Sequence, residues 1–149
     1  MAFFTEPARS SDLKDALALL RETGLPLNGV VEAFGHYLVV RDEGKMVGLC
    51  GLEVHGPDAL LRSVAVHALY RGQGVGAVLV DGAAELGQRL ALRALYLLTT
   101  GADGYFERQG FSSCPRESAP AGIQESWEFQ AGCPKSAAFL VRPLAAAES

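Results

Sequence analysis

A glycine-rich turn with one arginine, Arg71-Gly72-Gln73-Gly74-Val75-Gly76, carries the clearest chemical signal in the chain. It follows an apolar run at 60–66 and comes directly before a helical pattern. Free backbone N–H groups and the dipole of a helix N-terminus attract an anion, and glycines let a ligand approach the main chain closely. Because Arg71 adds a full positive charge, the turn predicts a site for a phosphate or pyrophosphate group.

Two common phosphate-binding motifs do not match this turn. The chain has no G-x-x-x-x-G-K-[ST] run, which a Walker A loop requires. The dinucleotide motif G-x-G-x-x-G fails in both registers, because Ala77 or Leu79 stands where the last glycine belongs. The pattern that does fit is R-x-x-G-x-G, formed by Arg71, Gly74 and Gly76.

The segments on either side of the turn must position it. The run at 60–66 is short and β-branched and therefore predicts a buried strand, and a second apolar run at 94–98 predicts another. Between them an apolar stripe predicts a helix that ends near residue 90; its members are Leu79, Ala83, Leu86 and Leu90. A strand, a helix and a strand in this order form a βαβ unit, so the two strands should be parallel.

The rest of the chain predicts a mixed α/β fold in one domain over residues 1–144, with a frayed tail at 145–149. Strands at 37–41 and 46–54 should form an antiparallel meander with the strand at 60–66. The other expected elements are a short strand at 2–5, a helix from about residue 10 to Gly24, one or two helical turns at 30–34, a helix at 102–109, a loop at 111–120, a strand or loop at 126–129, and a last strand at 136–141.

Composition argues against several functions. The 149 residues carry a net charge of −4, whereas a nucleic-acid-binding protein needs a basic face. No apolar run approaches the length that spans a membrane, and the N-terminus lacks the pattern of a secretory signal, so we expect a cytoplasmic protein without a membrane partner. Cys50, Cys114 and Cys133 are too widely spaced to indicate a disulfide framework or a metal site.

In its place after a strand and before a helix, the R-x-x-G-x-G turn resembles the acetyl-coenzyme A motif of the GCN5-related N-acetyltransferases, the GNAT family. The predicted order of elements is similar to the β–α–α–β–β–β–α–β–α–β order of that family over nearly the whole chain. Residues 102–111 resemble a second family motif, A-x-x-[FL]-Y-x-x-x-G-F, with Phe106 in place of the tyrosine. Three shorter segments, 61–66, 95–100 and Cys133-Pro134, are similar to small bacterial N-acetyltransferases of the arsenic-resistance type.

The resemblance implies that acetyl-coenzyme A is the cosubstrate and that an amine attacks its thioester directly. In the family, the two parallel strands separate at their C-terminal ends and admit the pantetheine arm. The resemblance places the pyrophosphate on the glycine-rich turn and the acetyl carbonyl near a main-chain N–H at Val66. The residues expected to bind the cofactor are Val64, Ala65, Val66, Arg71, Gly72, Gln73, Gly74, Val75, Gly76 and Phe106.

Two proton transfers remain, and the residues leave alternatives open for both. Glu53, at the end of a predicted strand, is the candidate base, or else it pairs with Arg62. Relatives that acetylate amino-acid-like herbicides carry a glutamate where this chain has Leu61, which is a departure from their pattern. Tyr105 is the candidate acid, although it lies about 100° around a helix from Phe106, which holds the usual tyrosine position and cannot donate a proton.

Arg62 gives the best indication of the substrate. It interrupts an apolar run, and an unpaired buried guanidinium is costly, so it needs an anionic partner. That partner is either Glu53 or the carboxylate of an amino-acid-like substrate. Glu32 is a second candidate substrate contact, because the resemblance places it with Asn28 and His36 in the segment that caps the acceptor site.

These features predict an N-acetyltransferase that acts on the primary amine of a small molecule, an amino acid or a toxic amino-acid analogue. Two alternatives stay open: an acyl-coenzyme A-binding sensor or partner module, and a protein or peptide N-acetyltransferase. The missing tyrosine favours the sensor, and an open, acidic groove would favour the peptide substrate. The sequence leaves the oligomeric state open, with a homodimer as one possibility.

Overall fold

The computed structural model describes residues 2–132 and 134–145, and its centre is a mixed seven-stranded sheet in the order β1-β2-β3-β4-β5-β7-β6. All neighbouring strands are antiparallel except β4 and β5, which are parallel as predicted. The mixed α/β fold class is therefore confirmed. The strands are β1 (Glu6–Pro7), β2 (Tyr37–Asp42), β3 (Lys45–His55), β4 (Asp58–Val66), β5 (Ala94–Thr99), β6 (Ser112–Ser113) and β7 (Ala138–Pro143).

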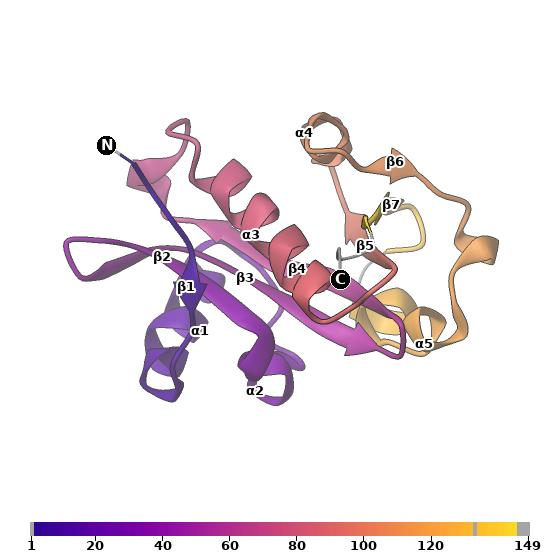
Figure 1. The fold of residues 1–149 in the computed structure, drawn as a ribbon, viewed down its shortest axis with the longest axis horizontal. Coiled ribbons are helices and arrows are strands. Elements are labelled where there is room, and N and C mark those ends of the chain that lie inside the picture. The colour runs from indigo at the N-terminus through magenta and orange to yellow at the C-terminus, as the bar shows by residue number, and fades with distance from the viewer. Residues whose placement is uncertain (1, 133, 146–149) are drawn as a thin grey trace.

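Helices cover both faces of the sheet (Figure 1). The α-helices are α1 (Leu13–Glu22), α2 (Val30–Ala33), α3 (Val75–Arg89), α4 (Asp103–Arg108) and α5 (Ala121–Gln124). Short 3₁₀ turns lie at Ser10–Asp12, Phe34–His36, Ala68–Tyr70 and Arg116–Ser118, and a π-helical turn lies at Glu128–Gly132. Within the described residues, no helix is both long and apolar enough to cross a membrane.

The alternation of side chains along β2 shows how the two layers form. Leu38 and Val40 join the core beneath α3, while Tyr37 and Val39 join the core beneath α1 and α2. Because both faces are covered, the strand is a continuous apolar run rather than an alternating one. Helix α3 therefore packs against an apolar face of the sheet, and this packing fixes the position of its N-terminus.

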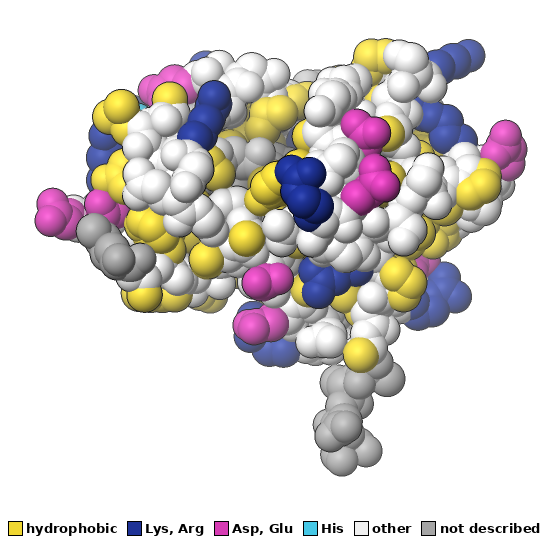
Figure 2. Space-filling view, turned by 90° about the horizontal axis from the view of Figure 1, so that it is seen from above, with side chains coloured by type: hydrophobic (Ala, Val, Ile, Leu, Met, Phe, Trp, Pro, Cys, Tyr) yellow, Lys and Arg dark blue, Asp and Glu magenta, His cyan; other side chains and the backbone are white. Residues whose placement is uncertain are grey.

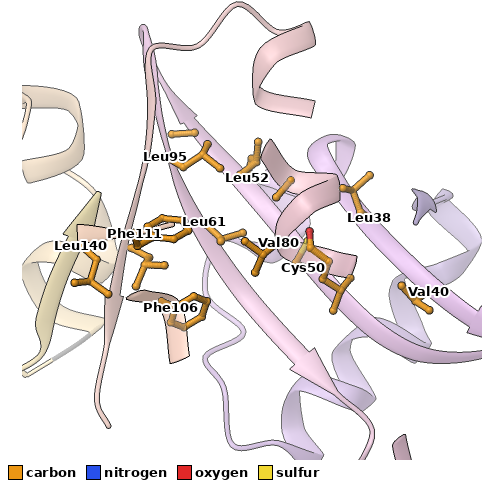
Figure 3. Packing of buried hydrophobic residues seen from close by; sticks show 14 of the residues in the cluster. Leu38, Val40, Cys50, Leu52, Leu61, Val80, Leu95, Phe106, Phe111 and Leu140 are labelled. Atoms are coloured by element: carbon orange, nitrogen blue, oxygen red, sulfur yellow. The ribbon is translucent and has the colours of Figure 1, made fainter. Parts of the chain in front are cut away.

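Phe106 belongs to the core on the α3 side. It packs edge-to-face against Phe111, with ring centroids 5.9 Å apart, and is almost fully buried. Figure 3 shows the two rings beside Leu61 and Leu140, which come from β4 and β7. The aromatic side chain at this position thus fixes α4 to the sheet near the cavity described below.

Two irregularities separate β4 from β5 at their C-terminal ends. The strands pair only from Asp58 to Leu60 on β4, although β4 continues to Val66. Further along β4 the register with β3 shifts at a β-bulge, where Ser63 has a φ of +59°. The separation of the two parallel strands that the family resemblance implied is therefore confirmed.

Several boundaries differ from the sequence predictions. The first strand is at Glu6–Pro7 rather than at 2–5, because Phe3 packs against Tyr70 instead of pairing with the sheet. Leu90 is exposed rather than part of the buried stripe, because α3 ends at Arg89 and the chain turns at Ala91.

Two further predictions fail between α4 and β7. The expected loop at 111–120 contains strand β6, which is too short to show any alternation. The segment at 126–129 is helical, not a strand: burial alternates from Ser126 to Glu128, but Ser126 Oγ accepts a hydrogen bond from the Phe129 amide and holds a helical turn. Most of the predicted tail, and Cys133, lie outside the described residues.

Candidate active site

A cavity of about 1040 Å³ opens between the separated ends of β4 and β5. Its walls come from both faces of the sheet. On the α3 side they include the glycine-rich turn, the start of α3 and residues of α4; on the other side they include residues 23–26, Glu128, Gly132 and Pro134. Because one cavity joins the two faces, a long ligand can enter at the turn and reach groups on the far side of the sheet. On the face drawn in Figure 2, acidic and basic side chains are interspersed rather than gathered by sign.

The glycine-rich turn has the geometry of an anion site. Gly74 is the N-cap residue of α3, with a φ of +87°, and Gly72 has a φ of +79°. A Cβ atom at either position would meet no heavy atom within 4 Å, so the main chain is open toward a ligand. The first amides of α3 have no partner within the helix and point to the same place.

A buried ionic cluster contributes Arg62 and Glu128 to the cavity wall. Arg62 is 7% exposed, and its Nη1 donates a 2.7 Å hydrogen bond to Glu53 Oε2. Nη1 also contacts Glu128 Oε1, and Nη2 donates to the main-chain oxygen of Asn28. The other oxygen of Glu53 is 2.7 Å from His55 Nε2. Of the two partners that the sequence leaves open for Arg62, the structure pairs it with Glu53.

Tyr37 and Ser63 lie beside this cluster. Their hydroxyl groups are 2.7 Å apart, and burial raises the pKa of Tyr37 to about 12. The phenol therefore stays neutral at physiological pH and is hydrogen-bonded to Ser63, which lines the cavity. Gly51 makes room for the ring, because a Cβ atom there would lie 2.1 Å from Tyr37 Cε1.

Residues 33–113, more than half of the chain, match the family model of the acetyltransferase (GNAT) domain. The chain belongs to the GNAT acetyltransferase family. It is thus an enzyme of the class that transfers an acetyl group from acetyl-coenzyme A to an amine. An uncharacterized N-acetyltransferase of Chlorobaculum tepidum is 28% identical over 138 residues, which cover 85% of this chain and 86% of that protein.

Other similar proteins of this GNAT family differ in their acceptors. A putative ribosomal protein bS18-alanine N-acetyltransferase of Bacillus subtilis is 30% identical over 63% of this chain and 60% of its own length. The structure of N-acetylglutamate synthase from Neisseria gonorrhoeae, complexed with coenzyme A and N-acetyl-glutamate, superposes with a TM-score of 0.84 at 18% identity. That match covers 97% of this chain but only 36% of the synthase, so it shows a shared fold.

Most residues predicted to bind the cofactor line the cavity between β4 and β5. They are Val64, Ala65, Val66, Arg71, Gly72, Gly74, Val75, Gly76 and Phe106. Gln73 is turned aside, and its amide donates to the main-chain oxygen of Leu69. Tyr105 also lines the cavity, and burial raises its pKa above the ordinary range.

The predicted acceptor-side residues are less closely grouped. Arg62 lines the cavity, whereas Glu53 lies behind it with both carboxylate oxygens engaged. Glu32 is exposed on α2 and lies outside the cavity wall. The assignment of Glu53 as base and of Glu32 as substrate contact stays a prediction.

Sequence reasoning missed Glu128 and His55. His55 is the last residue of β3, and nothing in its local sequence marks its contact with Glu53. Glu128 lies in a segment without clear periodicity, and the only local feature that distinguishes it is its position between two aromatic residues, Trp127 and Phe129. Its position on the wall depends on how the segment after α5 folds back over β4.

Proposed function

We propose that this acetyltransferase acetylates the primary amine of a small molecule, an amino acid or an amino-acid analogue. The observation that carries the proposal is a pair of charged residues on the cavity wall, Arg62 and Glu128, that are both more than nine-tenths buried. Buried charges on the wall suit a small, charged acceptor, whereas a peptide acceptor needs a groove that continues past the reacting amine.

Arg62 supplies a contact for the acidic part of such an acceptor. Its Nε is buried and, among the residues that the structure describes, has no hydrogen-bond partner. A buried donor without a partner costs free energy that a bound carboxylate oxygen would recover. The Neisseria synthase was solved with an acetylated amino acid, which supports the same class of acceptor.

The proposed cofactor site runs from the turn to the gap between the strands. Acetyl-coenzyme A, when bound, supplies an activated acetyl group. The first amides of α3 and Arg71 hold the pyrophosphate, and the free edge of β4 at 64–66 holds the pantetheine arm in an extended form. A main-chain N–H near Val66 polarises the acetyl carbonyl, so catalysis depends mainly on positioning and on hydrogen bonding to the developing charge.

The test is thiol release from acetyl-coenzyme A in the presence of single amines. The panel contains amino acids, phosphinothricin and its arsenical counterpart, polyamines, and peptides that start with alanine; calorimetry measures cofactor binding in parallel. We expect turnover with one or more amino acids or analogues and none with peptides. Turnover with peptides alone would assign the domain to protein N-termini, and cofactor binding without any turnover would make it a sensor module.

A further inference from the structure

Glu128 is a buried acidic residue on the cavity wall, and among the described residues its side chain is paired only with Arg62. It is 7% exposed, and neither carboxylate oxygen accepts a hydrogen bond from the described residues. Arg62 Nη1 lies against Oε1 as an ion pair and also donates a hydrogen bond to Glu53, so Oε2 is the oxygen of Glu128 that has neither an ion pair nor a hydrogen bond among the described residues. A buried polar group in this state costs free energy, and the cost is recovered only when a donor arrives.

The charges around Glu128 also call for a cation. The cluster contains two carboxylates, on Glu53 and Glu128, against one guanidinium on Arg62. The formal charges of Glu53, Glu128 and Arg62 sum to one excess negative charge in a largely buried place. An ammonium group that enters the cavity would restore neutrality and give Glu128 the donors that it lacks.

The geometry favours Glu128 over Glu53 for this contact. Both oxygens of Glu53 are engaged, by His55 and Arg62 at 2.7 Å each, and the residue lies behind the wall. Glu128 is part of the wall itself, in the same cavity as the glycine-rich turn and the strand edge at 64–66. A group in that position can meet an amine that approaches the end of the pantetheine arm, directly or through one water molecule.

We propose that Glu128 binds the ammonium group of the acceptor and takes up one of its protons before the amine attacks. The N–H bond breaks and its proton goes to a carboxylate oxygen of Glu128. The nitrogen lone pair then forms the C–N bond to the acetyl carbon, and the C–S bond breaks. The second proton of the nitrogen goes to the leaving thiolate, and Glu128 later releases its proton to solvent. This inference rests on the proposed function.

Burial is consistent with this role. It raises the pKa of Glu128 above the ordinary value, with Glu53 adding to the shift and Arg62 opposing it. A carboxylate with a raised pKa is a stronger base toward an ammonium group than an ordinary one.

The experiment compares Glu128→Gln with the wild-type enzyme, using the amino acid of the panel with the highest turnover. We expect kcat/KM near neutral pH to fall by roughly 10²-fold or more. The pH profile of kcat/KM should change shape. In the variant the rate should follow the fraction of the acceptor amine that is unprotonated, up to the pKa of that amine. The difference in rate between variant and wild type should therefore shrink as pH rises. Calorimetry with coenzyme A bound should show acceptor affinity weaker by about tenfold, the loss expected for a charged hydrogen bond.

Glu125→Gln is the matched control, because Glu125 is exposed at the end of the neighbouring helix and should leave both measurements unchanged. Glu128→Asp serves as a second variant that keeps the charge; it should keep the wild-type profile shape at a lower rate. An unchanged profile and affinity in Glu128→Gln would overturn the proposal. Wild-type enzyme that binds coenzyme A but turns over no small amine would instead refute the proposed function, so the two failures are distinguishable.

Discussion

The hydroxyl group of Tyr105 lies over Gly76, the second residue of α3. A Cβ atom on Gly76 would be 2.3 Å from Tyr105 Oη, so the glycine is what allows this contact. The ring of Phe106, by contrast, points into the core. The polar end of the neighbouring tyrosine therefore reaches the cavity at the cofactor turn, while the family's usual tyrosine position holds only an apolar ring.

Tyr105→Phe tests whether this hydroxyl protonates the leaving thiolate. Because burial raises its pKa, the phenol is protonated at neutral pH and can act as a donor. We expect kcat to fall by roughly tenfold to 10²-fold, with the coenzyme A Kd within about twofold of wild type. Tyr70→Phe is the control, since Tyr70 also lines the cavity but its hydroxyl donates to Asp42. A higher Kd at unchanged kcat would show that Tyr105 only contacts the cofactor.

The cofactor half of the site was predictable because it lies in one continuous segment. The turn, the strand before it and the helix after it are local in sequence. Each is marked by its own pattern of apolar residues or of glycines. The pairing of Arg62 with Glu53 was also accessible, since the residues lie on adjacent antiparallel strands near the Glu53–Leu60 pair.

The acceptor half was much less predictable. Glu128 reaches Arg62 only because the chain after α5 folds back over β4, and no local pattern marks that contact. The segment 23–26 lines the cavity, whereas the predicted contact Glu32 is exposed on α2, because the helix turns its polar residue outward and buries Val30. Contacts between segments far apart in sequence decide both cases.

Gly74→Val should weaken cofactor binding without unfolding the domain. The φ of +87° at Gly74 costs a side chain about 1–2 kcal/mol, and the branched group would project from the turn that is proposed to hold the pyrophosphate. We expect the coenzyme A Kd, measured by calorimetry, to rise at least about tenfold, a loss of about 1.4 kcal/mol.

Gly44→Val is the matched control for that strain. Gly44 has a φ of +79° and no neighbour within 4 Å of a Cβ position, but it lies in the hairpin between β2 and β3. It should lose a similar free energy of unfolding and keep the wild-type Kd. Equal affinity losses in the two variants would mean that general destabilisation, not the turn, controls binding.

Arg62→Met should be the most destabilising single change at the site. It leaves Glu53 and Glu128 close together without their counter-charge, and breaking a buried pair in this way costs about 3–5 kcal/mol. Denaturant unfolding at neutral pH measures the loss. Adding Glu128→Gln to Arg62→Met should recover part of it, because one of the two uncompensated charges is removed.

Arg93→Gln provides the comparison for Arg62→Met. Arg93 also pairs with a buried carboxylate, that of Asp58 at 2.7 Å, but its own side chain is 67% exposed. We expect its removal to cost less than that of Arg62, because one buried carboxylate rather than two loses its counter-charge. Similar losses in the free energy of unfolding for the two variants would show that the ionic cluster at the cavity contributes no more to stability than the Arg93–Asp58 pair does.

Glu128→Gln should stabilise the domain more at neutral pH than at acid pH. Because the pKa of Glu128 is raised on folding, the folded protein binds more protons than the unfolded chain between the ordinary and the raised value. The stability contributed by this group therefore falls as pH rises through that window, and glutamine has no such loss. The difference in Tm between variant and wild type should increase as pH rises above the ordinary pKa of a glutamate, about 4. The exposed Glu125→Gln should show a nearly constant difference. If the Glu128→Gln enzyme is more stable but slower than wild type, the cavity wall keeps an unfavourable charge because the reaction needs it. If the difference in Tm is constant for Glu128→Gln, as it should be for Glu125→Gln, the carboxylate of Glu128 is solvated like an exposed one.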